Sequence, residues 1–105
     1  MLLPVGPLPD DPLAAAAKFH ADWLPRVLEL LDAGEPLVTL VFAPAGLSHA
    51  GWRESAVQLL ARERTPARIN AVCGDDPAAI SATAAFIASA PGLTGQYLVV
   101  DGNGA

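Results

Sequence analysis

Apolar positions along the chain follow a helical period in some stretches and form short unbroken runs in others. Residues 13–34 carry apolar side chains at helical spacing, and Asp11-Pro12 in front of them is a typical helix start. Pro25 is expected to kink or split this helix, and Gly34 to end it. The expected apolar stripe contains Ala16, His20, Trp23, Leu24, Val27, Leu28 and Leu31.

The short apolar runs are predicted to be buried strands, over residues 36–44, 67–73 and 96–100. Runs without strict alternation are typical of parallel strands that are covered on both faces. Helical patterns over residues 48–64 and 75–90 separate them. We therefore predict one α/β domain over residues 1–105. It would be half of a Rossmann-like doubly wound fold, with three to four mostly parallel strands, about three helices and right-handed crossovers.

The last run, TGQYLVV, is expected to be a structural strand whose removal unfolds the domain. Side chains alternate along a strand, so Leu98 and Val100 should face one side of the sheet, and Tyr97 and Val99 the other. All four should be at least partly buried. The DGNG that follows, residues 101–104, is expected to be a polar tail.

Composition narrows the kind of protein. Hydrophobic residues make up 52% of the chain and charged residues 16%, more apolar surface than a small domain hides alone, so we expect an oligomer. The net charge is −5 without a basic run, which argues against a nucleic-acid partner. Pro44 and Gly46 interrupt the longest uncharged stretch, so no membrane span is expected. Neither does MLLPVGPLPDD look like a signal peptide. The lone Cys73 excludes an internal disulfide and suggests a reducing cytoplasm.

Four segments carry a family resemblance: residues 1–6, 23–31, 60–72 and 78–102. The last one contains a helix, a Thr-Gly turn and a strand ending in Asp-Gly, and residues 68–72 read Arg-Ile-Asn-Ala-Val. Residues 23–31 hold the Leu-Pro of a kinked helix. Residues 1–6 resemble a degenerate form of the strand that ends in Asn-Asn-Ala-Gly in the enzymes. In this order the segments resemble the second half of the short-chain dehydrogenase/reductase family. The resemblance covers nearly the whole chain.

The residues that such enzymes use for catalysis have no counterpart here. No Gly-x-x-x-Gly-x-Gly loop, which cradles the dinucleotide pyrophosphate, occurs in the sequence. The family's Tyr-x-x-x-Lys falls on Gly46 and Ala50, its Ser on Ala43, and its Asn near Pro12 or Leu13. None of these side chains transfers a proton. The resemblance therefore implies a relative with no catalytic residues and no cofactor.

Single reactive residues give weaker signals. His49-x-x-x-Arg53 could replace Tyr-x-x-x-Lys, but a solvated helix start is the preferred interpretation. His20 is expected to be packed or interfacial, and Tyr97 to be a packing residue. Cys73 lies at a strand end without a base nearby in sequence. Two histidines and one cysteine with this spacing predict no metal site.

The favoured hypothesis is a catalytically inactive assembly module. In the family it resembles, the kinked helix and the next helix pack against the same pair of another subunit, and the last helix and strand form a second interface. The chain is thus expected to form homo-oligomers or to pair with a reductase-like protein, through Trp23, Val27, Leu31, Trp52, Leu59 and Phe86. The alternative is a subunit of an NAD(P)-dependent oxidoreductase whose nucleotide-binding half comes from another chain, pairing at the MLLPV edge. A third possibility, a small-molecule binder at the strand ends, has no residue constellation in the sequence to support it.

Overall fold

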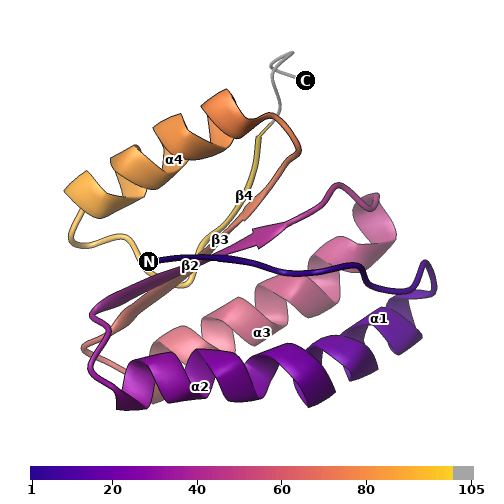
Figure 1. The fold of residues 1–105 in the computed structure, drawn as a ribbon, viewed down its shortest axis with the longest axis horizontal. Coiled ribbons are helices and arrows are strands. Elements are labelled where there is room, and N and C mark those ends of the chain that lie inside the picture. The colour runs from indigo at the N-terminus through magenta and orange to yellow at the C-terminus, as the bar shows by residue number, and fades with distance from the viewer. Residues whose placement is uncertain (101–105) are drawn as a thin grey trace.

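A four-stranded parallel sheet with helices on both faces makes up the domain (Figure 1). The structure, a computed structural model, describes residues 1–100, so the predicted DGNG tail lies outside the described residues. The strands are β1 (Leu2–Pro4), β2 (Leu37–Phe42), β3 (Arg68–Cys73) and β4 (Tyr97–Val99). The helices are α1 (Pro12–Lys18), α2 (Leu24–Asp32), α3 (Ala50–Glu63) and α4 (Pro77–Ser89), with a π-helical turn at Phe19–Trp23 and a 3-10 turn at Leu47–His49.

The strands lie side by side in chain order, and every neighbouring pair is parallel. Helices α1, α2 and α3 cover one face of the sheet, and α4 covers the other (Figure 1). Each connection steps in the same direction across the sheet, so the crossover through α4 has the opposite hand to the two before it. The expectation that all crossovers are right-handed is therefore wrong for one of the three.

Pro25 is accommodated by a wider helical turn. The N–H of Leu24 bonds to the carbonyl of Phe19, five residues back, and Pro25, which has no N–H, opens α2. The predicted kink thus takes the form of a π turn between α1 and α2. The extra residue in that turn shifts the buried face, so Phe19 is fully buried although it lay outside the predicted stripe.

Helix α2 ends as the sequence indicates. Gly34 has a φ of 98°, its N–H bonds to the carbonyl of Leu31, and the N–H of Glu35 bonds to that of Leu30. This pair of bonds at a glycine in the left-handed region closes the helix and turns the chain into β2.

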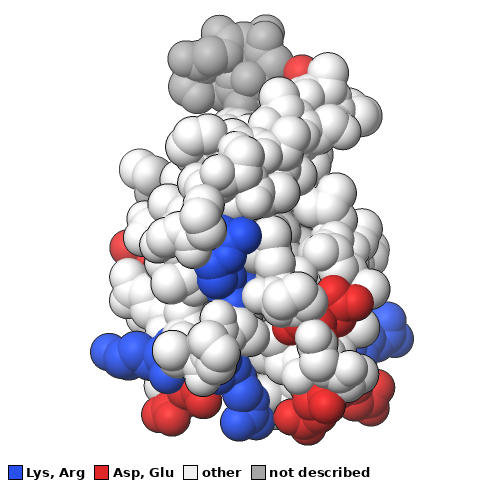
Figure 2. All heavy atoms as spheres, turned by 90° about the vertical axis from the view of Figure 1, so that its left-hand side faces the viewer, with Lys and Arg blue, Asp and Glu red and all other residues white. Residues whose placement is uncertain are grey.

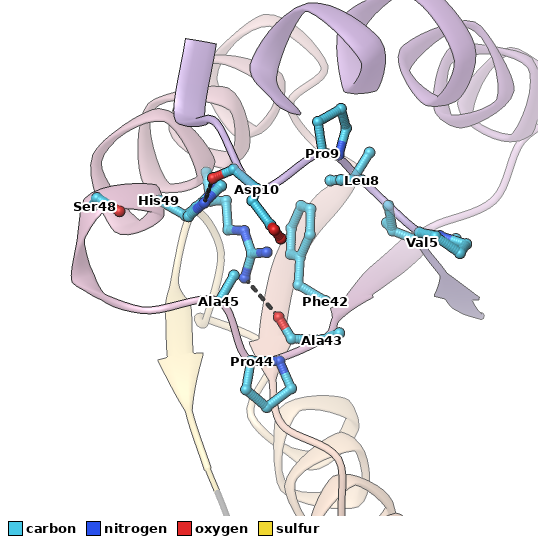
Figure 3. A pocket seen from close by; sticks show the side chains of 13 residues that line it. Val5, Leu8, Pro9, Asp10, Phe42, Ala43, Pro44, Ala45, Ser48 and His49 are labelled. Carbon is cyan, nitrogen blue, oxygen red and sulfur yellow. Dashed lines mark hydrogen bonds between the residues drawn. The ribbon is translucent and has the colours of Figure 1, made fainter. Parts of the chain in front are cut away.

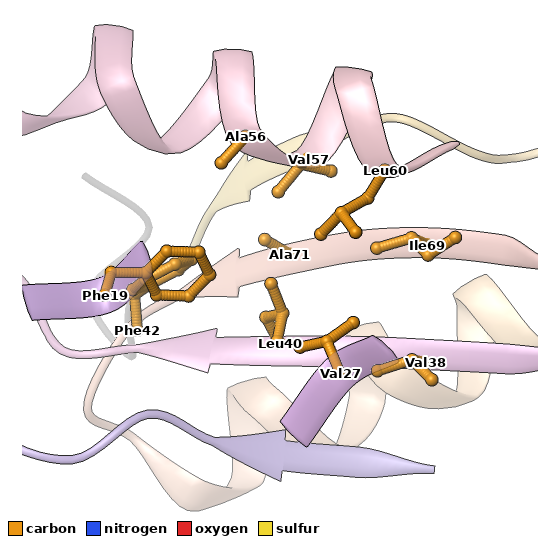
Figure 4. Packing of buried hydrophobic residues seen from close by; sticks show 10 residues of the cluster. All are labelled: Phe19, Val27, Val38, Leu40, Phe42, Ala56, Val57, Leu60, Ile69 and Ala71. Carbon is orange, nitrogen blue, oxygen red and sulfur yellow. The ribbon is translucent and has the colours of Figure 1, made fainter. Parts of the chain in front are cut away.

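The main core lies between the sheet and the layer of α1, α2 and α3 (Figure 4). Alternate residues of β2 and β3 point into it and meet side chains from the three helices. The cluster consists of Phe19, Val27, Val38, Leu40, Phe42, Ala56, Val57, Leu60, Ile69 and Ala71. Burying an aliphatic or aromatic side chain of this size contributes about 1.5–3 kcal/mol, so this layer is the main source of stability.

The opposite face of the sheet is held by polar bonds as well as by packing. Arg68 Nη1 lies 3.1, 2.7 and 3.1 Å from the carbonyls of Ile87, Ala90 and Leu93, at the end of α4. The buried amide of Asn70 donates to Leu93 and accepts from the N–H of Gln96. Both side chains therefore connect β3 to the segment that leads into β4.

Strand β4 is only partly covered. Tyr97, Leu98 and Val100 are half-buried, but Val99 is 65% exposed. The expectation of burial is wrong for Val99, because it lies at the outer end of a short edge strand, opposite Cys73 at the end of β3. No helix within residues 1–100 has the length and apolar character needed to cross a membrane.

Candidate functional site

A pocket of about 600 Å³ opens at the carboxyl ends of β1 and β2 (Figure 3). Its walls come from the β1–α1 segment, the end of β2, and the start of α3. Val5, Leu8 and Phe42 give it apolar walls, and Asp10, Ser48, His49 and Arg53 add polar groups. Ligands of open parallel sheets bind at this edge, so the pocket is the candidate site.

Arg53 is the most unusual residue of the pocket. It is 3% exposed, and its Nη1 lies 3.0 Å from the carbonyl of Ala43, 3.2 Å from the Tyr97 hydroxyl and 3.6 Å from the Cys73 sulfur. The guanidinium carbon lies 4.5 Å from the centre of the Phe42 ring. Its Nε is buried without a hydrogen-bond partner, and no carboxylate of residues 1–100 forms an ion pair with Arg53.

His49 connects the start of α3 to the β1–α1 segment through hydrogen bonds of both ring nitrogens. Its Nε2 donates to the carbonyl of Asp10 at 2.9 Å, and its Nδ1 accepts from Trp52 Nε1 at 3.2 Å. Because a carbonyl only accepts and an indole N–H only donates, Nε2 is the donor and Nδ1 the acceptor in this geometry. The preferred interpretation of His49 and Arg53 as a solvated helix start is wrong. Both are 3% exposed, because the β1–α1 segment and the ends of the strands enclose the start of α3.

Tyr97, the first residue of β4, and Cys73, the last residue of β3, lie against Arg53. Burial raises the pKa of the Tyr97 phenol above 10.0, the Cys73 thiol raises it further, and the Arg53 guanidinium partly lowers it. Tyr97 packs against the core, as predicted, and its hydroxyl also accepts from Arg53. Cys73 is buried, and its thiol donates to the carbonyl of Ala43 at 3.7 Å.

The positions matched to the dehydrogenase catalytic residues hold no reactive group. Ala43 follows β2 and offers Arg53 only a carbonyl. Gly46 has a φ of 82°, a conformation that side chains rarely adopt, and Ala50 is the first residue of α3. A nicotinamide cofactor would meet no hydroxyl or amine at these three positions, so the residues present do not fit the family's cofactor chemistry. No group of three or more potential ligand residues within residues 1–100 could hold a metal ion.

Comparison with known proteins agrees with this fold. The model of the SDR-like family, described as short chain dehydrogenase-like protein, matches residues 3–100. The chain belongs to the SDR-like family. The resemblance to short-chain dehydrogenases and the Rossmann-like α/β fold predicted from the sequence are thereby confirmed. No curated protein and no solved structure matches the chain.

The residues predicted to form an interface lie apart on the SDR-like fold. Val27 is fully buried in the core, so its assignment to an interface is wrong: the π turn directs it toward the sheet. Leu31 is half-buried against that core. Trp23 packs toward Gly6 under the Arg26 guanidinium, on the β1 side of α2.

The other three predicted interface residues, Trp52, Leu59 and Phe86, differ in their exposure. Trp52 is half-buried among Phe19, Phe42 and His49. Phe86 is 59% exposed on α4, which contains no charged residue, and Leu59 is 51% exposed on α3. Figure 2 shows that charged side chains gather over the lower, helical layer of the face it presents, whereas few lie in the upper part.

An apolar groove of about 320 Å³ runs between α2 and α3. Leu24 and Leu28 line it from α2, and Leu59 lines it from α3. His20 also lines the groove and is exposed, with Nδ1 2.7 Å from the carbonyl of Ala16. The sequence indicated Leu59 as an interface residue and His20 as packed or interfacial, but it gave no sign that the two share a groove.

Proposed function

We propose that this SDR-like chain is a catalytically inactive assembly module, two copies of which pack together through α2 and α3. The observation that carries the proposal is the apolar groove between these helices, which Leu24, Leu28 and Leu59 leave open on the surface. A partner of like geometry would fill it. The same pair of helices forms the subunit contact in the short-chain dehydrogenases that the chain resembles.

The arithmetic of a two-fold contact supports self-association. In a symmetric dimer each groove residue contributes twice, so three leucines supply six side chains. A fully buried leucine is worth about 1.5–3 kcal/mol, and the two partly buried ones contribute less. A sum of several kcal/mol remains before the cost of association, which is enough for micromolar assembly when packing is good.

Inactivity is proposed because Ala43, Gly46 and Ala50 occupy the catalytic positions. No proton donor or acceptor stands at these three positions. We place the module in the cytoplasm, where its single cysteine stays reduced, with no nucleic-acid or membrane partner.

Sedimentation velocity at tens of micromolar tests the assembly. The unmodified chain should sediment as a dimer, and Leu59→Glu as a monomer with unchanged circular dichroism, because it places a charge in the groove. Leu47→Glu is the matched control, since Leu47 is 93% exposed and lies outside the groove, and it should remain dimeric. A monomeric wild type, or a Leu59→Glu chain that still dimerises, would refute the proposal. Dissociation by Phe86→Glu alone would place the contact on α4 instead.

The alternative, a subunit completed by the nucleotide-binding half of another chain, rests on the open edge of β1. Met1 and Val5 bond to β2, so Leu2 and Pro4 direct their backbone groups outward. Pro4 has no N–H to offer a further strand, which is how edge strands avoid pairing. This feature makes self-association through the helices the better-supported function.

A further inference from the structure

We propose that the pocket at the carboxyl ends of β1 and β2 binds a small organic monocarboxylate, held by the guanidinium of Arg53. Assembly through α2 and α3 needs no ligand, so this site would be a second property of the molecule. The pocket and the groove are lined by different residues, and each can be tested without the other.

The charge of Arg53 is the first argument. An arginine that is 3% exposed has lost most of its hydration, and such a charge is normally paired with a carboxylate. Within residues 1–100 the guanidinium instead meets the carbonyl of Ala43, the hydroxyl of Tyr97 and the ring of Phe42, none of which carries a negative charge at neutral pH. An anionic ligand would supply the missing charge.

The distribution of hydrogen bonds on the guanidinium is the second argument. Nη1 makes all the bonds of Arg53 to described residues, and these fix the side chain against the end of β2 and the start of β4. Nε is buried and has no partner. Nε is thus left without an acceptor among residues 1–100, and Nη2 makes no bond to them either. These two groups are the donors with which an arginine holds the two oxygens of a carboxylate.

The walls of the pocket define the rest of the ligand. Val5, Leu8 and Phe42 offer apolar surface for its body. Asp10 lines the same pocket, as Figure 3 shows, and its carboxylate opposes a second negative charge on the ligand. One carboxylate on an apolar body fits this combination better than a phosphate or a dicarboxylate.

Titration with benzoate, followed by chemical shifts in NMR spectra, tests the site. Benzoate should bind in the millimolar range and shift the resonances of Phe42, Ser48 and His49, because these residues line the pocket. Benzamide has the same shape without the charge and should cause no saturable shifts. Inorganic phosphate should bind at least about tenfold more weakly than benzoate. Equal binding of benzamide would overturn the role of Arg53, and equal binding of phosphate would overturn the carboxylate class.

Two variants should change the affinity in opposite directions. Arg53→Met should weaken benzoate binding at least about tenfold, the usual worth of a hydrogen bond to a charged group. Asp10→Asn should strengthen it about threefold, because it removes the opposing charge. The Asp10 side chain is exposed, and its bond to His49 uses the backbone carbonyl, so this variant keeps the fold even if Arg53→Met does not. Unchanged affinity in Asp10→Asn, or shifts outside the pocket, would overturn the proposal.

Discussion

At the scale of single residues, one nitrogen of Arg53 connects three neighbouring strands. It donates to Ala43 after β2, lies near Cys73 at the end of β3, and reaches Tyr97 at the start of β4. Because these bonds converge on one buried group, the three strands are expected to respond together when that group is altered.

Tyr97 offers a direct test of this environment. It is the only tyrosine of the chain, so phenolate absorbance during a pH titration follows it alone. Its midpoint should lie above 10.0, because burial disfavours the phenolate, and Arg53→Met should raise it further by removing the guanidinium that lowers it.

The same shift predicts how stability depends on pH. The folded-state pKa of Tyr97 lies above the unfolded value, so its contribution is fully present below about pH 10 and is lost as the pH rises through the folded pKa. If the phenolate midpoint of Tyr97 in the folded chain lay at or below that of a free tyrosine, the buried environment described here would be contradicted.

Arg53 and His49 also show where sequence reasoning stops. Charged residues at the start of a helix are usually solvated, and nothing local in the sequence says otherwise. Their burial depends on Asp10, Phe42 and Tyr97, which come from three other segments. The pocket residues therefore could not be predicted as a group, whereas the absence of catalytic side chains at Ala43, Gly46 and Ala50 was visible in the sequence.

At the scale of elements, the pattern of apolar runs predicted β2, β3, β4, about three helices, and the helix ends at Pro12 and Gly34. The structure has four helices, because the first predicted helix is divided before Pro25 into α1 and α2. The pattern did not predict the π turn at Phe19–Trp23. The N–H of Leu24 bonds to the carbonyl of Phe19, five residues back, and the apolar pattern does not distinguish this carbonyl from that of the next residue. Neither did it predict the hand of the crossover through α4. The bonds of Arg68 to Ile87 and Ala90 hold the end of α4 on its face of the sheet, and contacts between segments so far apart are not visible in a local pattern.

Two glycines test how β4 and α3 are held. A Cβ on Gly74 would fall on the backbone carbonyl oxygen of Val100, well inside contact distance, so β4 must shift. Gly74→Ala should lower the free energy of unfolding by about 1–3 kcal/mol. Gly51→Ala is the control: it lies in α3 with no atom within 4 Å of the added methyl, and should raise stability by about 1 kcal/mol. Denaturant unfolding measures both, and equal stability of the two variants would refute the tight approach of β4 to Gly74.

At the scale of the whole molecule, the SDR-like scaffold separates fold from chemistry. The parallel sheet, the kinked helix and the final strand are those of a dehydrogenase-like fold, and the family match spans residues 3–100. The catalytic positions hold small residues, while the helices that join subunits in such proteins expose an apolar groove. Our account is therefore that the scaffold has been kept for binding and assembly rather than for hydride transfer.

Titration calorimetry of the purified chain with NADH and with NADPH tests this account most directly. The described residues supply neither the pyrophosphate loop at a helix start nor the hydroxyl and amine that position the nicotinamide. We expect that neither cofactor gives a saturable heat of binding when it is titrated into the folded protein. Stoichiometric binding of either one with micromolar affinity would contradict it and would identify the chain as a working part of a dehydrogenase.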